Sequence, residues 1–597
     1  MAAKVAAGEL PPVEERLPLN PHVVECIEEV GQYCGDLHRA NTDITDVWDW
    51  STQVKESLVR WDYRDGTLKM IPNLAESWEV SEEGRVYTFH LRKGLKWSDG
   101  EPFTADDFMF WYEDVALNKE LTPTFPAWLI VGGEPVVLEK VDDYTFNMRF
   151  AEPAGLLLDF LCFRGEAMIT PKHYLSQFHP KYVDPDELNA KAKAANFEFW
   201  HQWFLNLNQG WTNPDLPVVW PWRLVTPPDT GRLVAERNPY YWRVDTEGKQ
   251  LPYFERFICE MAQNGENVLL RAVAGEIDIQ YRHLGFANIS LLRENEERGN
   301  YRIREWVSGG GPCVNISQSA MDPNVRAVNQ TQAFRTALSH AINRDEMNDL
   351  FWFGVGRPSN SVIAPNDPTW VEGTDAAALA YDVDKANALL DEAGLDQRDA
   401  DGFRLRPDGQ RLEVLLECYP MEMGTPLADV FQQVALYWQE VGVSTQMKEI
   451  ERSLWSQRAL ANEMDYPSYV TGNYLWMIDP GGTLPWGTCY YAMGFAPWGP
   501  SNGTQGEEPT EEIKEIQAWY AQALMEPDLE KRLDLGRRIV SRVHELLYVI
   551  GTVAIDIMPI LVKNDLVNVL EVAPGQHRSG HESITWPFQV WRRGESA

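Results

Sequence analysis

The residues best suited to contact a ligand lie in an aromatic stretch at 470–500, VTGNYLWMIDPGGTLPWGTCYYAMGFAPWGP. Aromatic residues mixed with Gly, Pro and Asn indicate loops, because backbone polar groups in irregular segments need partners or water. Rings on loops form flat apolar platforms, on which the C–H faces of sugar rings or the side chains of peptides can pack. The chain has 24 Trp, and most of them are expected to pack in cores. Trp476 and Trp486 are the strongest candidates for ligand contact, and Tyr474 and Trp498 belong to the same stretch.

The chain carries none of the common motifs for covalent or metal chemistry. G-x-S-x-G, the P-loop and H-E-x-x-H are all missing from the sequence. His173 and His179 are six residues apart, which places them on different faces of a helix. Residues 396–410, DQRDADGFRLRPDGQ, have Gln397 and Asp408 where a calcium loop needs Asp and Glu, so they predict a hairpin turn. We therefore expect no catalytic residue, no metal site and no cofactor.

Length and charge narrow the class of protein. The 597 residues suffice for about three domains with substantial cores. The formal net charge of −36 disfavours nucleic acid and anionic lipid headgroups, because phosphate binding needs clustered Lys and Arg. The most apolar segment, Leu546 to Val562, is interrupted by Asp556 and Pro559 and predicts a buried strand or helix.

The start of the chain and its cysteines bear on the compartment. Residues 1–21, MAAKVAAGELPPVEERLPLNP, lack the apolar core of a signal peptide, which indicates either a cytoplasmic protein or a mature form with an added Met. Residues 1–20 predict a polar arm or a disordered segment. The seven cysteines are an odd number, so at least one is unpaired within the chain. Cys26 and Cys34 are expected either as buried thiols or as a disulfide.

Residues 83–107 are expected to form a strand, a turn and the start of a helix. Tyr87, Phe89 and Leu91 alternate along 86–91 as in a half-buried strand, and Glu83-Gly84 precedes them as a turn. Asp99-Gly100 predicts the end of a partner strand. Thr104 is placed to cap a helix, with acidic residues in its first turn.

Later segments alternate between helix and strand. Residues 331–347 place apolar side chains on one helical stripe, and Asp382 can cap a helix that ends at Gly394. Residues 427–441 predict a helix that ends at Gly442 and leads into a strand at Val443. The alternation predicts an α/β protein.

Residues 74–114 contain LAESW followed by YTFHLRKGLKWSDGEPFTADD. This long ordered segment resembles the signature of bacterial family 5 extracellular solute-binding proteins of ABC transporters, the dipeptide- and oligopeptide-binding class with its oligosaccharide-binding members. The segments at 233–253 and 331–347 resemble further blocks of the family, and the resemblance covers about 70 to 570. Residues 24–37 are similar to an entry segment of sugar-binding members, with Cys34 and Asp36 in place of Gly and Thr.

The resemblance implies the two-lobed periplasmic-binding-protein fold of type II, in which two α/β lobes are joined by a hinge and a small domain is inserted in the first lobe. We expect lobe I to comprise 1–57, 218–305 and 553–597, the inserted domain 58–217, and lobe III 306–552.

The resemblance also implies the partners and the compartment. We expect a monomer that binds a small-molecule ligand, docks on a membrane permease and does not bind nucleic acid. We expect it in the periplasm or outside the cell, with lipid anchoring left open. Expected ligand contacts are Trp48 or Trp50 on lobe I, Asn315, Trp352 and Trp370 on lobe III, and the stretch from Tyr474 to Trp498.

Asp479 bears on whether the ligand is a peptide or an oligosaccharide. In peptide-binding relatives an acid in the corresponding loop pairs with the α-ammonium group of the peptide. Asp479 is the only acid nearby, but it directly precedes Pro480 and can match a later acid-Pro pair of that loop. This departure and the Trp content favour an oligosaccharide or glycoside. The alternatives are an oligopeptide or dipeptide, a secreted carbohydrate-active enzyme, and a chaperone or signalling receptor of the same family.

Overall fold

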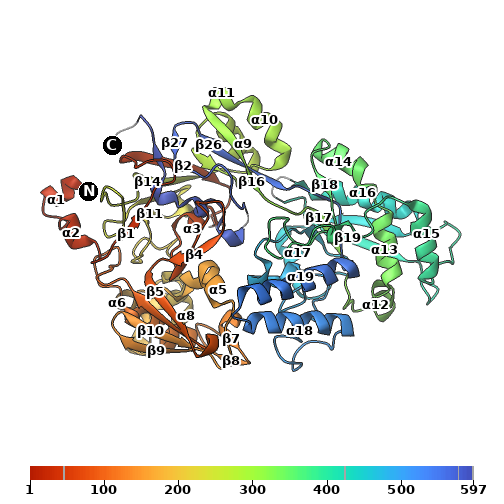
Figure 1. Ribbon diagram of the computed structural model, residues 1–597, viewed down its shortest axis with the longest axis horizontal. Coiled ribbons are helices and arrows are strands. Elements are labelled where there is room, and N and C mark those ends of the chain that lie inside the picture. Colours follow the sequence, from red (N-terminus) through yellow and green to blue (C-terminus); the bar gives the residue numbers. More distant parts are fainter. Residues whose placement is uncertain (45–47, 423–424, 576, 595–597) are drawn as a thin grey trace.

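The computed structural model describes all residues of the chain other than 45–47, 423–424, 576 and 595–597. Figure 1 shows the strands of lobe I and of the inserted domain on one side and the helices of lobe III on the other. Both termini lie at the lobe I end of the molecule (Figure 1). Within the described residues, every helix is too short or too polar to cross a membrane.

Lobe I is built on two sheets whose strands come from distant parts of the chain. The first has the order β11-β12-β14-β2, with β14 parallel to β2, and the second has the order β15-β26-β16. Their bounds are β2 Cys34–Asn41, β11 Trp222–Thr226, β12 Arg232–Arg237, β14 Phe254–Met261, β15 Ile279–Gln280, β16 Tyr301–Val307 and β26 Ile557–Lys563. The segment Leu546 to Val562 therefore contributes strands, one of the two predicted outcomes.

Smaller elements complete lobe I. Strand β1 (His22–Val24) pairs in parallel with β13 (Arg243–Asp245). The helices include α3 (Trp48–Val54), α9 (Gly265–Val273), α10 (Ile289–Glu294) and α11 (Glu296–Gly299). The arm predicted for residues 1–20 instead contains the helices α1 (Ala2–Ala6) and α2 (Val13–Arg16), and Arg16 is buried against Gln250 at 2.8 Å. Cys26 is a free thiol and forms no disulfide with Cys34.

The inserted domain has a sheet of order β5-β6-β10-β9, with β5 Ala75–Ser81, β6 Val86–Leu91, β9 Val137–Asp142 and β10 Thr145–Arg149. Phe89 and Phe146 stack across it with ring centroids 5.7 Å apart. Thr104 caps α4 (Ala105–Phe110) as predicted, and Asp107 completes a capping box. The predicted partner strand ending at Asp99-Gly100 is wrong, because β6 pairs with β5 and β10.

The core of the inserted domain is continuous with that of lobe I, because one apolar cluster runs from Val24 through Phe146 to Trp591. The helices of this domain include α5 (Leu157–Arg164), α6 (Lys172–Leu175), α7 (Pro185–Ala194) and α8 (Trp200–Leu207). The two parts thus share one buried interior.

Lobe III contains the predicted α/β unit. Helix α16 (Leu427–Glu440) ends before Gly442 and leads into β22 (Ser444–Glu449), which pairs in parallel with β19 (Glu413–Cys418). Asp382 caps α15 (Val383–Glu392) as predicted. The single helix predicted for 331–347 is wrong: α13 (Gln332–His340) ends, and α14 (Arg344–Trp352) begins at a new cap in which Asn343 accepts from Glu346 N.

The rest of lobe III comprises a three-stranded sheet and further helices. The sheet β23-β17-β24 combines β17 (Pro312–Asn315), β23 (Ser468–Val470) and β24 (Val549–Gly551). The remaining long helices are α12 (Pro323–Asn329), α17 (Arg452–Leu460), α18 (Glu511–Met525) and α19 (Leu529–Leu546). One apolar cluster lies around α16, and another lies beneath α18 and α19.

With the predicted lobe bounds, the chain would pass between lobe I and lobe III at two segments, 308–311 and 552–556. They hydrogen-bond to each other: Ser308 N donates to Asp556 O at 3.0 Å, and Ile555 N donates to Gly310 O at 2.9 Å. Gly310 has a φ of +98°, a conformation that favours glycine. These segments have the geometry of a two-stranded hinge.

Candidate functional site

Asp479 lies where lobe III meets the C-terminal segment of the chain. It separates two single turns, η9 (Trp476–Ile478) and η10 (Pro480–Gly482). Arg578 Nη2 donates to Asp479 Oδ2 at 2.7 Å and to its carbonyl oxygen at 3.1 Å. Arg164, at the end of α5, approaches the same carboxylate at 3.7 Å. Two arginines, Arg164 and Arg578, therefore already pair with Asp479.

Arg578 is the buried partner in this contact. Its side chain is only 5% exposed, and Nη1 donates to Asn473 Oδ1 at 2.9 Å. Burial lowers the pKa of Arg578, and the adjacent Asp479 opposes that shift. Hydrogen bonds between ionised groups in a water-poor site are stronger than neutral ones, so the pair holds the two segments together.

A second contact joins the inserted domain to lobe III. Gly155 N donates to Leu524 O, at the end of α18, at 2.9 Å. Leu156 and Phe160 lie in the same apolar cluster as Trp476 of lobe III. In Figure 1 α5 lies beside α19, whereas β16 and β17 flank the hinge segments on the opposite side.

Four of the eight aromatic residues predicted as ligand contacts are buried. Trp476 has 0% exposure, and its Nε1 donates to Thr369 Oγ1 at 2.7 Å. Trp50 packs on Phe257 with ring centroids 4.9 Å apart. Trp352 and Tyr474 are also buried, and burial raises the pKa of Tyr474. These four rings offer little surface to a ligand in this conformation.

The remaining predicted residues differ in accessibility. Asn315 is buried, and its side chain donates to Pro467 O at 3.1 Å. Trp370, Trp486 and Trp498 are partly exposed. Trp486 packs edge-on against Tyr520 at 5.0 Å between ring centroids. Trp48 begins α3, but its side chain lies outside those that the structure describes.

The structure brings together part of the predicted set. Trp476 lies in one apolar cluster with Trp370 and Trp486 packed at its edge, whereas Trp352 and Trp50 belong to two other clusters. Sequence reasoning missed Arg164 and Arg578, which no motif singled out.

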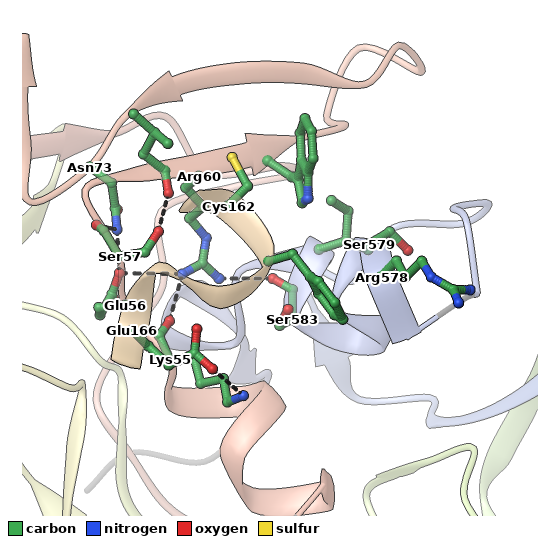
Figure 2. A pocket seen from close by; sticks show the side chains of 15 residues that line it. Lys55, Glu56, Ser57, Arg60, Asn73, Cys162, Glu166, Arg578, Ser579 and Ser583 are labelled. Atoms are coloured by element: carbon green, nitrogen blue, oxygen red, sulfur yellow. Dashed lines mark hydrogen bonds and ion pairs between the residues drawn. The ribbon is translucent and has the colours of Figure 1, made fainter. Parts of the chain in front are cut away.

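A cavity of about 60 Å³ lies next to the Asp479 contact. Its walls come from residues 55–61 after α3, from Cys162 to Glu166 at the end of α5, and from 578–584. Figure 2 shows Arg60 near its middle, between Glu56 and Ser583, with Lys55 beside Glu166 and Arg578 turned away at the far edge. The cavity thus adjoins the surface where the lobes meet.

Among the curated proteins, the chain is 30% identical over 434 residues to the periplasmic alpha-galactoside-binding protein of Rhizobium meliloti (strain 1021). This match covers 68% of the chain and 60% of that protein. The chain therefore spans about three fifths of the length of the curated relatives that it matches.

Two solved structures match almost the whole chain. An oligopeptide-binding protein OppA has a TM-score of 0.78 and 35% identity, covering 99% of this chain and 95% of that one. The periplasmic binding protein MelB from Agrobacterium fabrum C58, in complex with stachyose, has a TM-score of 0.77 and 22% identity, covering 99% and 90%. These similarities confirm the predicted two-lobed α/β fold of periplasmic binding proteins.

The family resemblance noted in residues 74–114 is confirmed over the main body of the chain. Residues 69–492 match the model of the bacterial extracellular solute-binding proteins, family 5 Middle, and the protein belongs to this family.

Proposed function

We propose that this protein is the substrate-binding component of an ABC importer, which captures an oligosaccharide or glycoside by hinge closure and delivers it to a membrane permease. It acts in the periplasm or outside the cell, and it binds its ligand without chemical conversion. The proposal rests on family membership and on the state of Asp479.

The pairing of Asp479 with arginine is the reason for proposing a sugar and not a peptide as the ligand. An acid that binds a peptide α-ammonium group must present its charge to the ligand. Here Arg578 lies at 2.7 Å and Arg164 at 3.7 Å from that carboxylate, so an ammonium group would have to displace two guanidinium groups. A neutral ligand meets no such competition. The curated relative at 30% identity is named for alpha-galactoside binding, which agrees with this choice.

An oligopeptide ligand is the alternative, and one observation favours it. The structure named as an oligopeptide-binding protein is 35% identical and covers 99% of this chain. In that case the Asp479–Arg578 pair would open when a peptide enters. A secreted carbohydrate-active enzyme is less favoured, because the family consists of solute-binding proteins and the sequence has no catalytic motif.

The contact between the inserted domain and lobe III supports closure. A hinge permits the lobes to separate, and contacts on the opposite side set how much free energy closure gains. Gly155 lies at this contact, where a Cβ atom would overlap the backbone carbonyl oxygen of Glu526. Only glycine fits at position 155 when the lobes are together. A larger residue there therefore tests whether the lobes close at this contact.

A screen by thermal shift tests the ligand class. We expect neutral oligosaccharides such as stachyose to raise the melting temperature and short peptides such as trialanine to leave it unchanged. A ligand at a hundred times its Kd stabilises by about 2.7 kcal/mol, which is a readily visible shift. A response to peptides alone that disappears in Asp479→Asn would establish the peptide alternative. Release of shortened sugar products would instead establish an enzyme.

The variant Gly155→Ala tests the closing contact. Its Cβ would overlap Glu526 O only when the lobes are together, and overpacking of this kind costs about 1–3 kcal/mol. We expect a larger radius of gyration in solution scattering and about a tenfold or greater loss of affinity for stachyose. Gly265→Ala is the control, because its Cβ would meet His283 Cβ at an ordinary 3.8 Å. Unchanged scattering and affinity in Gly155→Ala would contradict closure at this contact.

The raised pKa of Asp159, at the same contact, predicts that the free energy of unfolding depends on pH. It lies in α5 with Arg532 Nη2 of α19 at 3.8 Å, and the nearby Tyr87 and Cys162 carry no charge at neutral pH. Burial raises the pKa of Asp159 from its ordinary 3.8 to about 6. The folded protein therefore retains a proton that the unfolded chain releases, and the free energy of unfolding falls as the pH rises through this window.

Asp159→Asn cannot ionise and should avoid this loss. We expect the variant to be more stable than the wild type at pH 8, by up to roughly 3 kcal/mol, and the difference to shrink toward pH 4. Calorimetric melting at the two pH values measures it. Glu187→Gln serves as the control for removal of an exposed carboxylate, which pairs with Lys191. A variant less stable at pH 8 would show that attraction to Arg532 outweighs burial.

A further inference from the structure

The two segments that would cross between the lobes lie against a short strand, β18 (Arg357–Pro358), in the range predicted for lobe III. The pairing of β16 with β26 in lobe I ends at Val307 and Ile557. Just before that end, β25 (Val553–Ala554) pairs antiparallel with β18 instead. In Figure 1 β18 lies on the lobe III side of this crossing, and β16 and β26 lie on the lobe I side. The chain therefore changes from one partner strand to the other across residues 555–556.

Arg357 holds the side chain of Asp556 at this point. Arg357 Nε donates to Asp556 Oδ2 at 2.9 Å, and Nη2 donates to Oδ1 at 3.4 Å, which makes a two-point contact. The backbone of Asp556 is engaged as well, because Ser308 N of the other crossing segment donates to its carbonyl oxygen at 3.0 Å. Asp556 therefore links both crossing segments to β18.

Lobe III fixes the guanidinium group of Arg357 from its other side. Nη1 donates to Asp375 Oδ2 at 2.5 Å, and the side chain of Asp375 is only 7% exposed. Ser359 Oγ donates to the same oxygen at 2.8 Å. The guanidinium group also lies 5.7 Å from the centroid of the Trp370 ring. With these contacts in place, we expect Arg357 to stay with lobe III when the hinge turns.

We propose that Arg357 is a positioning residue that favours hinge closure through its contact with Asp556. Asp556 is followed directly by β26 of lobe I, so a rotation of lobe I turns its carboxylate relative to a guanidinium group that lobe III holds. A two-point contact is sensitive to orientation, and here it is made while the inserted domain touches lobe III. An interaction that is stronger in one of two conformations shifts the population toward that conformation. This role rests on closure as part of the proposed function and not on the choice of ligand.

The variant Arg357→Gln removes the charge and the two-point contact. We expect it to bind stachyose about 3- to 10-fold more weakly in titration calorimetry, the effect of losing one hydrogen-bonded pair. The melting temperature of the ligand-free variant should stay close to that of the wild type, because partly exposed ion pairs contribute little to stability. A role in stability alone would lower that temperature and leave the affinity of the folded protein unchanged.

Arg411→Gln is the matched control. Arg411 also pairs with two carboxylates, that of Asp399 at 2.6 Å and that of Asp401. Its side chain is 34% exposed, against 37% for Arg357, and its guanidinium group also lies over a ring, that of Phe403, at 4.9 Å. These groups lie outside the crossing segments, so we expect this variant to bind stachyose as the wild type does. A loss of affinity equal to that of Arg357→Gln would contradict a role specific to the hinge.

The variant Asp556→Asn breaks the same pair from the other side and keeps the test valid if Arg357→Gln does not fold. We expect the same loss of affinity, and a double variant that loses no more than either single one, because there is one interaction to lose. Unchanged affinity in both single variants, or additive losses in the double variant, would overturn the role of Arg357. A wild type that binds trialanine and no stachyose would overturn the proposed sugar ligand, and the same variants measured with trialanine would then decide on Arg357.

Discussion

The pairing of Asp479 with Arg578 is the constraint on which the site depends. The two groups come from different parts of the fold and meet at 2.7 Å, with the guanidinium almost fully buried. Arg578 is almost fully buried, so removing Asp479 would take away the carboxylate that compensates its charge. The loop at 473–483 is therefore held against the C-terminal segment, and the one acid of that loop points at an arginine. The proposed preference for a neutral ligand rests on this pairing, because Asp479 is already engaged by arginines before a ligand arrives.

Closure follows from the same arrangement. The hinge segments at 308–311 and 552–556 let the lobes move, while Arg164 and Gly155 bring the inserted domain against lobe III. The inserted domain shares a large apolar cluster with lobe I, so we expect it to move with that lobe. We infer that it extends lobe I far enough to meet α18 and α19.

The sequence predicted local features well and long-range ones poorly. The strand at 86–91, the cap at Thr104 and the helix before Gly442 depend on neighbouring residues, and the structure confirms them. The break after His340 was missed because Asn343 acts as a cap within an otherwise continuous apolar stripe. The partners of Asp479 are 99 residues away at Arg578 and still further away at Arg164, and no local pattern reports such pairs. Trp476 illustrates the same limit, because its burial depends on Thr369 and α19, which only the fold brings to it.

The pairing of Asp479 leads to one central prediction, that the protein selects a neutral oligosaccharide over a peptide. The most direct test is native mass spectrometry of the protein mixed with equimolar stachyose and trialanine, each above the protein concentration. We predict a complex with the mass of one bound stachyose and no peptide complex. A one-to-one peptide complex formed in the presence of the sugar would contradict the claim and show that the Asp479–Arg578 pair opens to admit an ammonium group.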